Sequence, residues 1–329
     1  MPDCAHSFVV SFRDATGSVV DEMEVTDLQP ISEELALLAV LKGDLPNDGG
    51  WGKAAIEPQW ENGELIGLTA SLGGVRMSYG LGVVAEPALG RLIEKGLLNG
   101  EHQDAKSLRW DVRVRDGSPV PARKLRFSVR RQPFPLSSAS PSDFGIETLP
   151  DGEDSVCVLA SSRLLEELRE ASGNSLETER ADVLTGYLLR EPAGSRVAAL
   201  LLERIPAEAD TSSSSVHIAF SPTTFEAVRK EHERRNDGQA ILGWHHNHPP
   251  PCGRECLQTL PACSTENLFF SVADRAVHRA SFGAPYMVGL VSGKGAQRRA
   301  DDPVVRAYGW RHGVICERSF SSFENGVAQ

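Results

Sequence analysis

The sequence predicts a mixed α+β protein of two domains. Its 329 residues are about twice the usual length of one domain. Short runs that are apolar at every second position predict strands, and segments with helical periodicity are interspersed among them. A stretch rich in proline and serine, 133–154, lies between the two halves of the chain and is expected to be a linker.

The N-terminal domain, 1–132, is expected to be a small α+β unit that begins with a hairpin. Residues 7–12 and 19–25 are rich in β-formers, and the sequence Asp-Ala-Thr-Gly-Ser between them is typical of a turn. Residues 31–41 then have helical periodicity, with Ser32 as the expected N-cap and a glycine just past the end.

The same domain is expected to continue with a second helix over 87–98 and a second hairpin. Residues 109–115 and 124–130 alternate between apolar and polar side chains, and an Asp-Gly-Ser-Pro turn follows the first of them. The residues of this domain show no catalytic spacing. We therefore expect it to be a recognition module.

The C-terminal domain, 155–329, is expected to be mixed α/β with a mainly antiparallel sheet. Two apolar runs around Glu-Pro-Ala-Gly predict a hairpin, and a serine followed by proline predicts the start of a helix. The expected strands are 156–160, 183–189, 197–205, 216–220, 240–244 and 286–291, and the expected helices are 162–171, one that begins at Pro222, and 271–279.

Composition excludes several classes of protein. No run approaches the roughly 18 apolar residues of a membrane span, and the N-terminus lacks the pattern of a signal peptide. A net charge of −11 argues against nucleic-acid binding. We therefore expect a cytoplasmic protein whose six cysteines are reduced thiols or metal ligands rather than disulfides.

The chemistry is concentrated in the sequence Gly-Trp-His-His-Asn-His-Pro. His246 and His248 are two residues apart at the end of an expected strand, so their side chains point to the same face and can bind one metal ion. Asp274 is the candidate third ligand, because a helix that begins near Ser271 presents both side chains from its first turn. Ser-x-x-Asp alone is a common helix cap, and the combination of the two motifs is far more specific than either.

Together these motifs resemble the JAMM/MPN metalloproteases of the prokaryotic type, whose pattern is a glutamate, then His-x-His-Pro, then Ser-x-x-Asp. The family's glutamate lies in Glu-x-x-Gly-aliphatic-Leu-x-Gly. Glu179-Arg-Ala-Asp-Val-Leu-Thr-Gly matches it, with Gly186 at the second glycine. Asp182 replaces the first glycine, which leaves Glu177 and Asp182 as alternatives to Glu179. The resemblance covers roughly 155–295.

The resemblance implies a JAMM/MPN-like fold for the C-terminal domain and one catalytic Zn²⁺, held by the two histidines and the aspartate. Glu179 would act as general base and then general acid, and Ser271 would donate a hydrogen bond to the oxyanion. The implied reaction is hydrolysis of an isopeptide or peptide bond after the C-terminus of a ubiquitin-like protein. The implied partner is that protein or its conjugates, with recognition by the N-terminal domain.

The interval between the two motifs is longer than in the family. Pro249 and Ser271 are 22 positions apart, and 250–268 is expected to be an insertion beside the site. A nearer Ser-Thr-Glu-Asn sequence ends at Asn267, but an amide is a poorer zinc ligand than the carboxylate of Asp274.

The insertion contains three cysteines, which have two interpretations. Cys252, Cys256 and Cys263 supply three thiolates for a second, structural zinc, with His245 or Cys316 among the candidates for a fourth ligand. Alternatively, they are reduced thiols in a loop.

Two other functions stay open. One is a non-catalytic scaffold of the same fold. The presence of all four His, His, Ser and Asp residues argues against it, because a scaffold does not need them. The other is a JAMM hydrolase that acts on a small-molecule or carrier-protein conjugate. The sequence indicates neither the oligomeric state nor the identity of the modifier.

Overall fold

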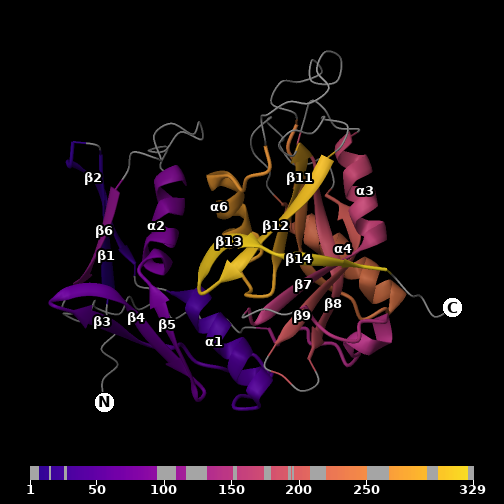
Figure 1. The fold of residues 1–329 in the computed structure, drawn as a ribbon, viewed down its shortest axis with the longest axis horizontal. Coiled ribbons are helices and arrows are strands. Elements are labelled where there is room, and N and C mark those ends of the chain that lie inside the picture. Colours follow the sequence, from indigo (N-terminus) through magenta and orange to yellow (C-terminus); the bar gives the residue numbers. More distant parts are fainter. Residues whose placement is uncertain are drawn as a thin grey trace. The chain divides into compact units, whose positions relative to one another are not determined.

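The computed structural model describes residues 7–14, 16–25, 28–94, 109–115, 132–150, 154–173, 179–191, 194, 196–207, 220–249, 267–294 and 303–324. The chain divides into two compact units. Unit 1 comprises Met1–Phe134 and His312–Val314, and unit 2 comprises Pro135–Arg311 and Ile315–Gln329. Helices and strands occur in both units, which confirms the predicted α+β class (Figure 1).

The first sheet of unit 1 has the order β2-β1-β6. The predicted hairpin is confirmed, since β1 (Ser7–Arg13) and β2 (Val19–Val25) pair antiparallel. The third strand, β6 (Arg109–Arg115), lies on the other side of β1, also antiparallel. The expected partner of β6, 124–130, lies outside the described residues.

The second sheet of unit 1 was not predicted. It consists of β3 (Ala55–Glu61), β4 (Glu64–Leu72) and β5 (Val75–Gly80), all antiparallel. Asn62 and Gly63 join the first two strands with φ values of 51° and 84°, as a tight hairpin turn requires. The Asn-Gly pair was therefore a usable signal for this hairpin.

The described part of unit 1 also contains two helices, and both begin earlier than predicted. α1 (Gln29–Lys42) has Leu28 at its N-cap position, so the expectation for Ser32 was wrong. Ser32 is buried within the helix, and its hydroxyl accepts a hydrogen bond from the backbone N–H of Ala54 (3.1 Å). α2 (Gly82–Glu94) contains Pro87 inside the helix rather than at its start. The core of unit 1 is formed by strands β1, β2, β4, β5 and β6 with both helices, and it includes Phe8, Phe12, Leu35, Leu68 and Val84.

Unit 2 is built on an eight-stranded sheet of order β13-β12-β11-β10-β8-β9-β7-β14. The sheet is mixed: β10–β11, β7–β9 and β7–β14 pair parallel, whereas β8–β9, β8–β10 and β11–β12 pair antiparallel. Its strands are β7 (Val156–Ser161), β8 (Ala181–Arg190), β9 (Val197–Pro206), β10 (Ala240–Asn247), β11 (Val288–Lys294), β12 (Pro303–Arg311), β13 (Val314–Arg318) and β14 (Phe320–Phe323). The last three were not predicted, and the expected strand 216–220 lies outside the described residues except for its last residue.

Among the residues that the structure describes, three α-helices accompany this sheet (Figure 1). α3 (Ser162–Gly173) contacts β7, β9 and β14 near one end of the strand order and β11 and β12 near the other, so the sheet curls around this helix. α4 (Pro222–Arg235) leads into β10, and α6 (Val272–Ser281) leads into β11. Among the described residues, no helix combines the length and the apolar character of a membrane span.

The stretch expected to be a linker, 133–154, packs against unit 2 over much of its described part. Leu136 forms a parallel bridge with Leu188 of β8. Ile146 and Leu149 are buried in a cluster that includes Leu159 and Leu200, among other residues of β7, β8 and β9. These residues therefore belong to the core of unit 2.

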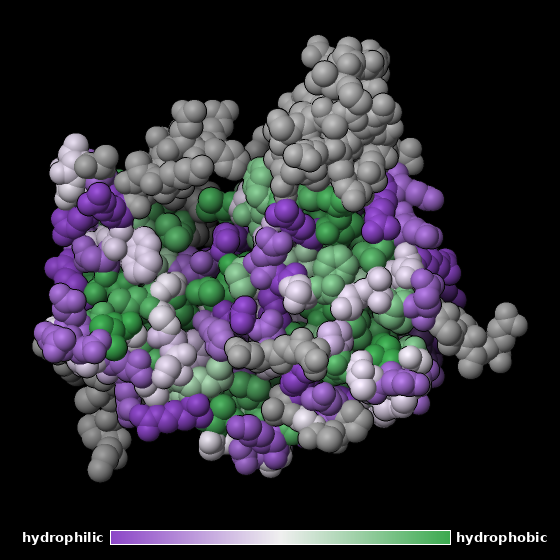
Figure 2. Space-filling model, in the orientation of Figure 1, coloured by the Kyte–Doolittle hydropathy of each residue, from purple (hydrophilic) through white to green (hydrophobic). Residues whose placement is uncertain are grey.

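The described surface is mixed in polarity, and Figure 2 shows hydrophilic residues interspersed with apolar ones over the visible face. Its exposed large apolar side chains are Val19, Val20, Trp60, Ile66, Trp110 and Phe269. All but Phe269 belong to unit 1.

Candidate metal centre

The end of β10 and the start of α6 meet in unit 2. β10 is a central strand between β8 and β11, and it carries His246. A Cβ at Gly243 would lie 1.9 Å from the carbonyl oxygen of Val288, so glycine permits the close pairing of β10 with β11. His248 follows directly after the strand, and its backbone N–H donates to Ser292 of β11 (2.8 Å), which extends the pairing to the second histidine.

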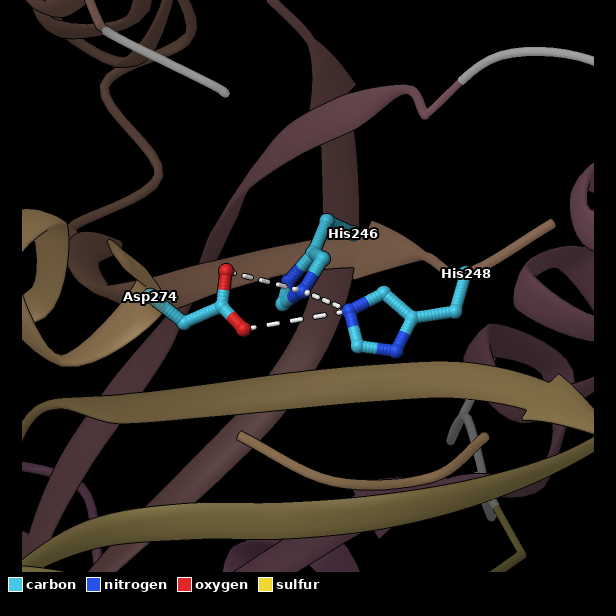
Figure 3. Close-up of side chains that lie close together, drawn as sticks. All are labelled: His246, His248 and Asp274. Atoms are coloured by element: carbon cyan, nitrogen blue, oxygen red, sulfur yellow. Dashed lines mark hydrogen bonds and ion pairs between the residues drawn. The ribbon is translucent and has the colours of Figure 1, made fainter. Parts of the chain in front are cut away.

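The predicted ligands His246, His248 and Asp274 lie together, and Figure 3 shows the carboxylate facing both imidazole rings. The Nε2 atoms of the two histidines are 3.0 Å apart. Asp274 Oδ1 is 3.3 Å from Nε2 of His246, and Oδ2 is 3.8 Å from Nε2 of His248. All three residues are buried, with exposed fractions of 0%, 8% and 6%.

This donor set fits a metal ion. Ligand atoms about 2.0–2.2 Å from one zinc ion in a tetrahedral site lie about 3.3 Å apart, close to the distances between these atoms. Two imidazoles and one carboxylate are ligands that zinc accepts, and three protein ligands leave a fourth position open. The residues could equally hold another first-row metal, because the donor set does not identify the ion.

Hydrogen bonds fix the orientation of His248. Its Nδ1–H donates to the backbone carbonyl of Asn267 (2.6 Å), which leaves the Nε2 lone pair of the neutral ring for a metal. The side-chain amide of Asn267 donates in turn to the carbonyls of His248 (3.1 Å) and Pro249 (2.7 Å). Asn267 therefore positions a candidate ligand, a role that the sequence analysis missed.

Aromatic packing fixes the orientation of His246. The ring of Trp244 stacks on it, with centroids 4.6 Å apart and planes 12° apart. The indole N–H of Trp244 donates to Nδ1 of His278 (3.0 Å), a fully buried residue of α6. Burial lowers the pKa of His278 to about 3, so this ring stays neutral and accepts the hydrogen bond.

Burial and the neighbouring charges set the protonation of the ligands. Burial lowers the pKa of His246, which favours the neutral form that binds metals. Burial also opposes the charged forms of His248 and Asp274, but other interactions outweigh it: Asp274 is stabilised by the charges and hydrogen bonds of His246 and His248, and His248 by the hydrogen bond and charge of Asp274. As a result the pKa of His248 is raised and that of Asp274 is well below its ordinary value. A bound metal ion would replace the proton as the partner of the carboxylate.

Glu179, the predicted base, lies at the edge of this group. Its Oε1 is 4.0 Å from Nε2 of His248, and its side chain is 14% exposed. Burial raises its pKa to about 7; the charge of His248 acts in the opposite direction and that of Asp274 in the same direction. A carboxyl group with such a pKa can both accept and release a proton near neutral pH. The alternative Glu177 lies outside the described residues.

Ser271 is the N-cap of α6, and the structure shows the capping arrangement that the sequence allowed. Its hydroxyl accepts from the backbone N–H of Asp274 (3.1 Å), and its own backbone N–H donates to Asp274 Oδ2 (2.6 Å). These bonds hold the carboxylate of Asp274 in place. The hydroxyl proton of Ser271 is not used in them and can donate elsewhere.

Asp182 and His245 form a buried pair behind the site. They face each other across β8 and β10, and Nδ1–H of His245 donates to Asp182 Oδ2 (2.8 Å). Nε2 of His245 lies 2.6 Å from the hydroxyl of Ser292, and Asp182 also pairs with Arg204 (3.0 Å). The order Ser-His-Asp matches a nucleophilic triad, but Ser292 is fully buried and out of reach of a substrate.

This pairing bears on two of the open candidates. Asp182 is engaged by His245 and Arg204, and is therefore unsuited as the alternative base. Both ring nitrogens of His245 also have partners, Asp182 and Ser292, within this group. Cys252, Cys256 and Cys263 lie outside the described residues, and Cys316 of β13 is a free thiol.

Comparisons with known proteins add little to this geometry. No protein-family model matches the chain, and no curated protein matches it. Among solved structures, it is similar to the solution structure of protein DSY2949 from Desulfitobacterium hafniense, with 18% identity and a TM-score of 0.31 over 51% of this chain and 93% of that one. A likeness at this level carries no argument about fold or function.

Proposed function

We propose that unit 2 is a zinc-dependent protease of the JAMM type with a JAMM/MPN-like fold. Its reaction is hydrolysis of an isopeptide or peptide bond after the C-terminus of a ubiquitin-like protein. The observation that carries the proposal is the buried His246, His248 and Asp274 group, with Glu179 4.0 Å from it. A base beside a three-ligand site is the arrangement that metal-assisted hydrolysis requires.

Each residue of the site has its own role in the proposed reaction. The two histidines and Asp274 would hold the zinc ion, which when bound would act as a Lewis acid and lower the pKa of water. Glu179 takes the proton of the attacking water and later gives it to the leaving amine. Ser271 donates its hydroxyl proton to the oxyanion that develops on the carbonyl.

The substrate class rests on the resemblance of the motifs. A ubiquitin-like protein ends in an extended Gly-Gly tail, and its conjugates present the amide bond that such a site hydrolyses. Unit 1 would recognise the modifier, the target or another partner. The proposed location is the cytoplasm, and the proposed cofactors are one catalytic zinc and a second, structural zinc at Cys252, Cys256 and Cys263.

Substituting Glu179 tests the proposal. Glu179→Gln removes the base but keeps the shape of the side chain, so zinc content should be unchanged and turnover should fall by about 10²- to 10⁴-fold. The assay uses a panel of ubiquitin-like proteins with an amide-linked fluorophore at the C-terminus, together with carrier-protein conjugates. Unchanged turnover would exclude Glu179 as the base.

The panel also separates the two alternatives. A chain that binds zinc and hydrolyses only carrier-protein conjugates would be a JAMM hydrolase of another substrate class. A chain that binds ubiquitin-like proteins and hydrolyses none of the panel would be a scaffold.

A further inference from the structure

Asn247 lies between the two histidines and binds the residue next to Glu179. The backbone N–H of Arg180 donates to Asn247 Oδ1 (2.7 Å), and the backbone N–H of Asn247 donates to the carbonyl of Arg180 (3.2 Å). Both backbone polar groups of Arg180 are thus held by a single residue. Asn247 is buried, with 3% exposure.

The geometry of the strand explains why this residue can act without touching the metal. Side chains alternate along β10, so Asn247 points away from the face that His246 and His248 share. The ladder between β8 and β10 pairs Ala181 with His246, and the bonds to Asn247 extend it by one residue toward Glu179.

A base must be held close to the proton that it takes, and a misplacement of about 1 Å can cost 10²-fold in rate. Glu179 is not itself in a strand, and residues 174–178 before it lie outside the described part of the chain. Its described backbone anchor is therefore the peptide unit that it shares with Arg180. Because Asn247 fixes that peptide, it also fixes the origin of the Glu179 side chain.

We propose that Asn247 is a positioning residue that sets the location of the Glu179 carboxylate relative to the two histidines. This inference rests on the proposed function, in which Glu179 is the base. It differs from a purely structural role because it predicts a loss of turnover without a loss of metal.

The test compares Asn247→Ala with two other variants. Asn247→Ala removes the acceptor of the Arg180 N–H, so hydrogen exchange at that amide should become faster. The value of kcat should fall by about 10- to 100-fold, with KM and zinc content unchanged. Asn247→Asp keeps an acceptor oxygen at this position and should restore most of the turnover. If Asn247→Ala does not fold, Asn247→Ser replaces it, because its hydroxyl lies one bond closer to the backbone than Oδ1.

A matched control exists on the same pair of strands. Thr185 of β8 is fully buried, and its hydroxyl donates to the side-chain carbonyl of Gln239 (3.2 Å), just before β10. Thr185→Val removes this link at the opposite end of the pair while keeping the side-chain shape. It should lower stability, as the loss of a buried hydrogen bond does, and leave kcat unchanged.

Each contrary outcome has its own meaning. If hydrogen exchange at the Arg180 amide becomes faster in Asn247→Ala but kcat is unchanged, the positioning role is overturned. It is also overturned if this amide stays protected from exchange in Asn247→Ala. Loss of zinc in that variant would also overturn it, because the effect would then act through the histidines. If the wild-type chain hydrolyses none of the panel, the proposed function fails and the inference fails with it. This outcome is distinct from the others because they require an active wild type.

Discussion

At the scale of single residues, Ser271 combines two roles that can be separated. Its hydroxyl caps α6, and its position beside Asp274 makes it the candidate donor to the oxyanion. Loss of an N-cap costs about 1 kcal/mol, whereas loss of an oxyanion donor costs about 10²–10³ in rate. The first effect lowers the stability of the fold, and the second lowers the rate of the reaction.

Ser271→Ala should therefore lower kcat by about 10²- to 10³-fold in addition to a small loss of stability. The control is Ser221→Ala, since Ser221 caps α4 and accepts from the backbone N–H of Thr224 (3.2 Å) outside the candidate site. Urea denaturation should show similar losses of stability for both variants, and steady-state kinetics should show the loss of turnover for Ser271→Ala alone. Equal turnover in the two variants would mean that Ser271 only caps α6 and does not donate to the oxyanion.

The sequence predicts the metal ligands better than their supporting residues. His246 and His248 could be placed on one face because side chains alternate in a strand, and Asp274 could be placed near Ser271 because both begin a helix. The contacts of Asn267 and the pairing of Asp182 with His245 involve segments far apart in the chain, so periodicity does not indicate them.

At the scale of elements, the turn between α4 and β10 is held by a charged group. Asp237 Oδ1 accepts from the backbone N–H of Gln239 (2.9 Å), and Oδ2 lies 3.0 Å from Nδ1 of His232. Burial raises the pKa of Asp237, but these bonds and the charges of His232 and Arg235 outweigh it and lower the pKa below its ordinary value of 3.8. The charged form therefore stabilises the fold above about pH 3.8, and this contribution is lost as pH falls through the folded-state pKa.

Asp237→Asn should be less stable than the wild type by about 1–2 kcal/mol at pH 7, because hydrogen bonds to a charged group are replaced by neutral ones. The difference should shrink as pH falls below 3.8, where the wild-type carboxylate becomes protonated. Urea denaturation at several pH values measures both quantities. A difference that stays constant down to pH 3 would contradict the assigned role of the charge.

The elements that could be predicted are those with strong periodicity. α3 and β7 to β11 were expected within a few residues, because α3 has helical periodicity and the strands contain runs of apolar residues. Strands β3 and β14 were missed because most of their residues are half-buried or exposed, which weakens the pattern. How deeply each strand residue is buried depends on tertiary packing, so the sequence alone does not predict it.

For the whole molecule, the proposed function depends on one metal ion in unit 2. Zinc per chain is the decisive measurement, by elemental analysis of wild type and Asp274→Ala purified without chelator, with Asp237→Asn as a control carboxylate. Asp274→Ala should lose one zinc equivalent and the control none, from a total near two if the cysteines also bind zinc and near one if they do not. Equal zinc in wild type and Asp274→Ala would contradict a metal site at His246, His248 and Asp274.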